Sequence, residues 1–351
     1  MSNDLDLLLE RFRDVAEGRE VSRPDVTFSR YAISNFRGGI GKSTLAFNLA
    51  WEISRKHNTL LLDACPQANF TQSLLGEEAT LDGAPSIYDA LLPGVMPGTD
   101  HISGDDLVTS VPPHCDAFKR GRKVYAIRGS KELFLFPALL YSQLSNASTL
   151  GSRSEATTRN ILKSVERVIA TANEVVDFDK VLIDTSPFFG GATHLSWIAA
   201  EALIVPVRVD QYSIDALRLT LSMLRDQSMD FLRLNKQAGI ESLPKVHAIA
   251  MTHCGWNRQS PFTPDRSTQA YLGQVLEIAS ENADLLSSKN PIECIHLLDD
   301  FHSAGRISGT RRMPLSTLKV GSQHTIQGQR LEVNQSLDRY KREIKSLAAT
   351  L

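Results

Sequence analysis

Residues 36–44 read Phe-Arg-Gly-Gly-Ile-Gly-Lys-Ser-Thr, and they stand between an apolar run at 31–33 and a helix-like segment at 45–55. A strand, a glycine-rich turn and a helix N-terminus in this order form the setting of a nucleotide phosphate-binding loop. Glycines let backbone N–H groups approach a phosphate without a Cβ in the way, and the helix N-terminus adds partial positive charge. The residues expected to hold the phosphates are Gly38, Gly39, Ile40, Gly41, Lys42, Ser43 and Thr44.

Two further apolar segments end in a carboxylate. Residues 59–63 and 181–184 both read as short buried strands, and their last residues are Asp63 and Asp184. Ligands of open α/β sheets bind at the carboxyl ends of the strands, which is the edge that also carries the phosphate loop. There Asp184 would hold the shell of a Mg²⁺ ion together with the Ser43 hydroxyl, as a Walker B carboxylate does.

The loop and the segment after Asp63 resemble those of the ParA/MinD family. The family's deviant loop reads Lys-Gly-Gly-x-Gly-Lys-Ser/Thr, and Arg37 stands at the first lysine; Phe36 occupies the place where an ordinary phosphate loop begins with glycine. Residues 63–69 resemble the family segment Asp-x-Asp-Pro-Gln-x-Asn, with Cys65 in place of the second Asp. In that family the first lysine reaches across a dimer interface to the partner's nucleotide.

The resemblance implies a fold and a function. The expected fold is α/β, a mostly parallel doubly wound sheet with helices on both faces, as in P-loop NTPases of the SIMIBI-like type. The expected protein is an ATPase that uses ATP and Mg²⁺, forms an ATP-dependent homodimer, binds double-stranded DNA without sequence preference and responds to a ParB-like partner. It would act in plasmid or chromosome partition or cargo positioning, in the cytoplasm and on the nucleoid when ATP-bound. Asp210 would lie near the adenine or ribose.

The departures from the family pattern bear on catalysis. The family's second Asp is tied to hydrolysis, whereas a thiol with an ordinary pKa of about 8.5 is mostly protonated at neutral pH. Hydrolysis should therefore be slow or use another group, for which Asp63 is a candidate; Cys65 could equally be a small buried residue without a role. The catalytic candidates are Arg37, Lys42, Asp63 and Cys65. A second possibility is a nucleotide-gated switch that binds ATP, dimerises and hardly hydrolyses it.

The composition is typical of a soluble protein whose cysteines are reduced thiols. The chain has 351 residues, 42% of them hydrophobic, a net charge of −2, and four cysteines without zinc or redox spacing. The sequence contains no run of 18 apolar residues, so a membrane span is not expected. The helix expected at 333–349 has acidic residues within its polar face, which argues against the membrane-binding helix of a MinD-type protein.

The order of predicted elements gives the domain plan. Residues 1–28 form a helical extension, and 29–351 form one ParA-like domain with a loop-rich insertion at about 93–131. Strands are expected at 30–35, 59–63, 133–136, 180–184, 202–207, 245–251 and 293–298. Helices are expected at 43–56, 156–176, 193–200, 213–235, 266–287 and 333–349.

Two basic groups could contact DNA phosphates. One is the run at 119–123, for which a solvated charged face is favoured. The other lies near the C-terminus, in a region where ParA proteins are thought to meet nonspecific DNA, and comprises Arg306, Arg311, Arg312 and Lys319. Because the net charge is negative, DNA binding would come from such local patches and would be salt-sensitive.

Overall fold

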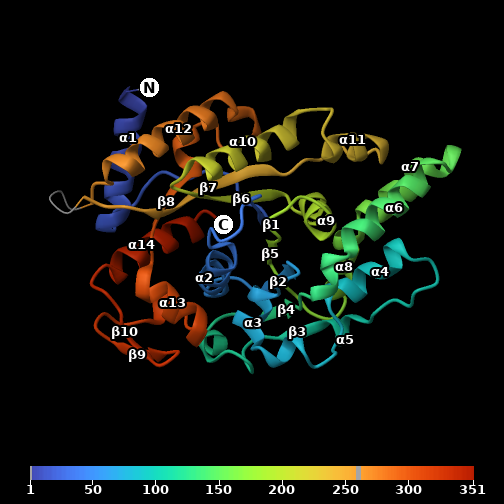
Figure 1. The fold of residues 1–351 in the computed structure, drawn as a ribbon, viewed down its shortest axis with the longest axis horizontal. Coiled ribbons are helices and arrows are strands. Elements are labelled where there is room, and N and C mark those ends of the chain that lie inside the picture. The colour runs from blue at the N-terminus through green and yellow to red at the C-terminus, as the bar shows by residue number, and fades with distance from the viewer. Residues whose placement is uncertain (1, 258–261) are drawn as a thin grey trace.

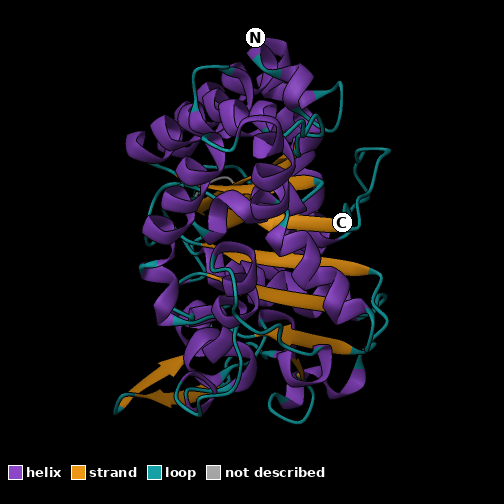
Figure 2. Cartoon of the chain, turned by 90° about the vertical axis from the view of Figure 1, so that its right-hand side faces the viewer, coloured by secondary structure: helices purple, strands orange, loops and turns teal. Residues whose placement is uncertain are grey.

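The computed structural model describes residues 2–257 and 262–351. Its centre is an eight-stranded sheet in the order β3-β4-β2-β5-β1-β6-β7-β8, parallel except for the β3–β4 pair at one edge. The strands are β1 (Arg30–Ile33), β2 (Thr59–Ala64), β3 (Val108–Ser110), β4 (Val124–Ile127), β5 (Lys180–Thr185), β6 (Ala202–Arg208), β7 (Lys245–Cys254) and β8 (Ile295–Asp299). Figure 2 shows these strands stacked between helices.

Helices cover both faces of the sheet, which confirms the predicted doubly wound α/β fold (Figure 1). One core contains side chains from α1 (Ser2–Glu17), α4 (Ile87–Val95), α6 (Phe136–Ser148), α7 (Ser154–Leu162), α8 (Ser164–Asn173), α9 (Ala192–Ala199), α10 (Gln211–Arg225), α11 (Asp230–Gln237) and α12 (Arg266–Glu281). The core on the other face contains side chains from α2 (Lys42–Ser54), α3 (Asn69–Leu75), α13 (His302–Arg311) and α14 (Leu337–Ala348). The central strands β2 and β5 are buried along their whole length because they are covered on both sides, whereas the edge strand β3 is partly exposed.

Both terminal helices pack on the domain. Leu8 and Phe12 of α1 are buried in the first core, and the buried Arg11 side chain donates to the carbonyl of Ser22 at 3.2 Å. The apolar face of α14 is buried against α2 and β8, and it includes the buried side chains of Tyr340 and Ile344. In the described part of the chain, none of the helices is both long enough and apolar enough to cross a membrane.

The strand predicted at 133–136 is wrong. Lys131–Phe134 forms a short 3-10 helix, and α6 begins at Phe136. Ser130 caps the 3-10 helix by accepting from the Glu132 N–H, and Pro137 stands in the first turn of α6, where its fixed φ suits a helix start. Phe134 and Leu135 are 72% and 74% exposed, so this apolar run is not a buried strand.

Other differences concern boundaries and short elements. The segment expected as a loop-rich insertion at 93–131 contributes β3 and β4 to the main sheet and a short helix, α5 (Gly104–Leu107). The helices expected at 156–176 and 213–235 are each divided in two, as α7 with α8 and α10 with α11. Helices α3, α4, α6 and α13 and the hairpin of β9 (Gln323–Ile326) and β10 (Gln329–Glu332) were not predicted.

Candidate nucleotide site

The glycine-rich loop lies open at the carboxyl end of β1. Gly39 and Gly41 have φ of 71° and 86°, in the left-handed region that favours glycine, and no atom lies within 4 Å of where their Cβ atoms would stand. Gly41 is also the N-cap residue of α2, and its carbonyl accepts the first helical hydrogen bond, from Leu45 N–H at 2.8 Å. The loop therefore presents free backbone donors at a helix N-terminus, as phosphate binding requires.

Lys42 is held across the base of the loop. Its Nζ donates to the carbonyls of Asn35 and Arg37, at 3.1 and 2.8 Å, and its side chain is largely buried. Burial lowers the pKa of Lys42, and the nearby Asp184 acts in the opposite direction. The ammonium is thus positioned beside the loop rather than extended into solvent.

Ser43 and Asp184 meet at the edge of the sheet. The Ser43 hydroxyl donates to Asp184 Oδ2 at 2.6 Å, and Asp184 Oδ1 is buried without a hydrogen-bond partner. Burial, together with the nearby Asp63, raises the pKa of Asp184 to about 8. A buried carboxylate oxygen without a partner next to a hydroxyl is a donor set that suits a divalent cation, and so the residues fit Mg²⁺.

Asp63 lies opposite Asp184, and both of its carboxylate oxygens already accept hydrogen bonds from the protein. The two residues are register partners in the parallel ladder of β2 and β5. Asp63 Oδ2 accepts from the Thr71 N–H and hydroxyl, each at 2.8 Å, and Oδ1 accepts from the Cys65 N–H at 3.1 Å. Burial raises the pKa of Asp63 to about 6 against these hydrogen bonds. This geometry favours a role for Asp63 in positioning the 65–71 segment over a role as general base.

Cys65 is a neutral thiol at this edge. It is 4% exposed, and burial raises the pKa of its thiol to about 12, with Asp63 and Asp184 adding to the effect. A thiol with this pKa already carries its proton at neutral pH, so it cannot accept another proton from the attacking water.

Arg37 lies on the other side of the loop, paired with Asp210. Its Nη1 is 3.1 Å from Asp210 Oδ1, and its guanidinium stands over the ring of Tyr212 at 5.2 Å. Asp210 also caps α10 by accepting from the Ser213 N–H at 3.0 Å. Arg208 Nε also lies 3.6 Å from Asp210 Oδ2, so the Asp210 carboxylate contacts two arginines and the first turn of α10.

A pocket of about 450 Å³ adjoins the loop beyond β7 and β8, and Asp210 does not line it. Its wall includes Gly39, Gly41 and Thr44 from the loop, Thr252 and His253 from β7, and the segment 298–306. Thr252 donates to the Ile40 carbonyl at 3.3 Å, which ties β7 to the loop. No sequence motif marks the segment 298–306. The feature that could have indicated it is the pair of carboxylates, Asp299 and Asp300, directly after the strand predicted at 293–298.

Phe36 packs into an aromatic cluster. Its ring stacks on Trp197 at 5.7 Å and meets the edge of Phe189 at 5.9 Å. The residue that replaces the first glycine of an ordinary phosphate loop thus anchors the start of this loop in the core.

The C-terminal basic residues have unlike surroundings. Arg306 and Lys319 are exposed, and Arg311 is exposed while donating to the Thr325 carbonyl at 2.7 Å. Arg312 instead donates to the carbonyls of Ser73, Leu74 and His114, at 3.1, 2.7 and 2.6 Å. Its guanidinium therefore links the end of α13 to the end of α3 and to the loop at His114, and this use of its donors argues against a role in DNA binding. In the run at 119–123, Lys119 pairs with Asp116 at 2.6 Å.

A mostly parallel doubly wound sheet with a glycine-rich loop after a central strand, a loop lysine, and a serine paired with a strand-end aspartate defines a P-loop NTPase. The family profile described as AAA domain matches residues 29–234, which is more than half of the chain. The chain belongs to this family and, within it, is a ParA/MinD-type P-loop ATPase.

Individual relatives are distant. The chromosome-partitioning ATPase Soj of Treponema pallidum is 28% identical over 192 residues, 54% of this chain and 61% of Soj. The solved ATP complex of a single-residue variant of Cyanothece McdA has a TM-score of 0.59 at 16% identity and covers 91% of this chain and 96% of McdA. A putative plasmid partition protein of Borrelia burgdorferi bound to AMPPNP has a TM-score of 0.54 at 13% identity, covering 94% and 100%. The first curated relatives are matched over 42% to 77% of their own lengths.

Proposed function

We propose that this protein is a ParA-like ATPase that binds ATP with Mg²⁺, dimerises over the nucleotide and then binds duplex DNA, acting in DNA partition or cargo positioning. The observation that carries the proposal is the Ser43–Asp184 pair, with its unpartnered carboxylate oxygen, at the mouth of an open glycine loop. Partition and chromosome-segregation relatives in the same family support the biological role.

ATP would lie with its phosphates on the loop and its base and ribose in the pocket beyond β7 and β8. The loop N–H groups and Lys42 would surround the β- and γ-phosphates, and Ser43 and Asp184 would hold Mg²⁺. When bound, Mg²⁺ would neutralise charge on the phosphates. His253 and Asp300 line the pocket and would contact the ribose or base, whereas the buried Asp299 is paired with Arg339.

Dimerisation would depend on Arg37. Its planar fork of donors suits a phosphate of the partner's nucleotide, but its pairing with Asp210 holds it on its own subunit in this structure. Arg37 would therefore exchange Asp210 for the partner's phosphate when the dimer forms.

DNA and the ParB-like adaptor are the proposed macromolecular partners. Arg306, Arg311 and Lys319 are the exposed cations proposed to contact DNA phosphates, which would bring the ATP form to the nucleoid. A second candidate is a switch that binds ATP and barely hydrolyses it, since the neutral Cys65 thiol supplies no general base.

The test is ATP turnover with and without nonspecific duplex DNA, with the oligomer mass measured in the same samples. We expect an ATP-dependent dimer with slow turnover that DNA stimulates. A dimer without turnover would select the switch. A failure to bind ATP·Mg²⁺, checked against the Lys42→Ala variant, would overturn both.

A further inference from the structure

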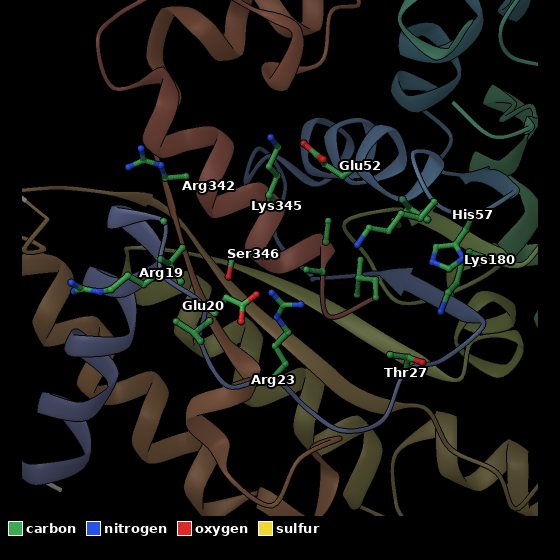
Figure 3. A pocket seen from close by; sticks show the side chains of 18 residues that line it. Arg19, Glu20, Arg23, Thr27, Glu52, His57, Lys180, Arg342, Lys345 and Ser346 are labelled. Atoms are coloured by element: carbon green, nitrogen blue, oxygen red, sulfur yellow. The ribbon is translucent and has the colours of Figure 1, made fainter. Parts of the chain in front are cut away.

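A second pocket, of about 610 Å³, opens at the edge of the sheet opposite the phosphate loop. Figure 3 shows its side chains coming from separate parts of the chain: the segment between α1 and β1, the last turn of α2 with the residues after it, the first residue of β5, and the last turns of α14. The first and last of these parts lie outside residues 29–234, the range that the family profile matches. The pocket is thus built largely by segments outside the range that the profile matches.

The lining is strongly cationic although the chain has a net charge of −2. Two acidic side chains line the pocket, Glu20 and Glu52. Against them stand six cationic ones: Arg19, Arg23, Lys56, Lys180, Arg342 and Lys345. Such a local excess of one sign in a concave surface concentrates ions of the opposite sign.

Some of these cations have protein partners. Arg19 pairs with Asp14 and Glu17, each at 2.6 Å. Lys180 and Arg342 each donate to a carbonyl at 2.6 Å, those of Phe28 and Ala16 respectively. These contacts fix the two side chains at the pocket without neutralising their charge.

Three other cations keep their donors free. Within residues 2–257 and 262–351, the side chains of Arg23, Lys56 and Lys345 make no hydrogen bond or ion pair. Burial raises the pKa of Glu52, while Lys345, Lys56 and other cations act against that effect. Glu52 accepts from the Ser316 hydroxyl, so it competes only partly for the neighbouring lysines.

We propose that this pocket binds a small polyanion, a metabolite that carries two or more phosphate groups. The free cations come from three different segments, so one ligand with several charges can contact them together. A volume of about 610 Å³ is in the usual range for small-molecule sites, and Val15, Val21 and Ile53 provide apolar walls for the body of the ligand.

This site is separate from the nucleotide site. Helix α2 has 13 residues, with the phosphate loop at its start and Glu52, Lys56 and His57 at or beyond its end. At 1.5 Å per residue the helix spans about 20 Å, which is too far for one nucleotide to occupy both sites.

The test is calorimetric titration of the full chain with inorganic pyrophosphate in magnesium-free, low-salt buffer. We expect two classes of site, of which Lys42→Ala removes one and Arg23→Ala/Lys345→Ala weakens the other at least tenfold. The control Arg218→Ala/Lys289→Ala removes equal charge from exposed residues elsewhere and should bind like the unchanged protein. The NMR signal of His57, assigned with His57→Gln, should shift with the second class.

Three results would overturn the proposal. One is loss of all pyrophosphate binding in Lys42→Ala, which would leave only the phosphate loop. Another is equal weakening in the control variant, which would mean diffuse attraction. The third is unchanged pyrophosphate binding in Arg23→Ala/Lys345→Ala together with weaker binding of duplex DNA, which would assign the cations to nucleic acid. If this double variant does not fold, Lys56→Ala replaces it, with the same expectation.

Discussion

Arg37 and Asp210 are joined by an ion pair of 3.1 Å beside the phosphate loop. The pair links the residue that stands at the family's dimer-bridging lysine to the N-cap of α10, and the stacking of Arg37 on Tyr212 supports it. The unbound subunit therefore holds the side chain that dimerisation would need, so the strength of this contact should set how readily the dimer forms.

Replacing Asp210 with Asn should favour the dimer. Asn caps a helix as well as Asp does, so the bond from Ser213 is kept while the charge that holds Arg37 is removed. A partly exposed ion pair contributes about 0.2–1 kcal/mol, and a symmetric dimer would break two of them. The ATP-dependent dimer should therefore form at up to about thirtyfold lower protein concentration. Analytical ultracentrifugation with ATP measures this. Arg37→Ala should abolish the dimer and keep ATP binding, and weaker dimerisation of Asp210→Asn would instead place Asp210 in the interface.

Cys65→Asp should raise ATP turnover about tenfold or more, since a positioned carboxylate can act on the attacking water. The same change should destabilise the nucleotide-free protein, because a third carboxylate would lie near the buried Asp63 and Asp184. Steady-state turnover and thermal unfolding measure the two effects. Cys65→Ser is the control of similar size without charge, and an unchanged rate in Cys65→Asp would reject this position as the cause of slow hydrolysis.

His247 should make the protein sensitive to acid. Burial lowers the pKa of His247 to about 4, and its ring nitrogens contact the Ser287 hydroxyl and the Thr350 carbonyl, each at 2.9 Å. Below the unfolded pKa of about 6.5, the unfolded chain takes up a proton that the folded chain does not. Stability is therefore full above pH 6.5 and falls toward pH 4, by up to about 1.4 kcal/mol per pH unit.

The variant His247→Gln keeps one donor and one acceptor and should reduce this slope. Urea unfolding between pH 4.5 and 7.5 measures it. His101→Gln, at an exposed position, should leave the slope unchanged. Equal slopes in all three proteins would show that other groups cause the loss of stability in acid.

Variants of Arg312 and Lys319 should show which of the two basic side chains serves packing and which serves DNA binding. Loss of the three carbonyl contacts of Arg312 should cost about 2–4 kcal/mol in Arg312→Ala, because hydrogen bonds from a charged donor contribute about 1.5–3 kcal/mol each and do not add fully. The exposed Lys319, which does not line the nucleotide pocket, is the comparison: Lys319→Ala should change stability by less than about 0.5 kcal/mol and weaken DNA binding with ATP. Chemical unfolding and fluorescence anisotropy measure these effects, and a stable Arg312→Ala that binds DNA weakly would reverse the assignment.

The parts of the site that local sequence rules specify were predictable. The glycines at left-handed φ, the helix that follows them and the two strands ending in Asp63 and Asp184 all depend on neighbouring residues and on the periodicity of buried strands. The register that places those two carboxylates opposite each other follows from parallel pairing of the strands. These features carried both the fold and the phosphate-binding half of the site.

The parts that depend on long-range contacts were not predictable. Asp210 is 173 residues from Arg37 in the chain, and no local pattern indicates that they pair. The cationic pocket needs α1, α2, β5 and α14 to meet at one edge, which spacing alone does not show. The strand predicted at 133–136 failed because apolar content outweighed the helix-start signals of Ser130 and Pro137.

The aromatic packing of Phe36 has an evolutionary consequence. Its ring fills space shared with Phe189 and Trp197, and a small residue at position 36 would leave a void between them. Contacting residues of this kind couple in their effects on stability, so changes at one are tolerated chiefly together with changes at the others. Among relatives, positions 36, 189 and 197 should therefore vary as a group, with a glycine at 36 accompanied by larger or differently shaped side chains at the other two.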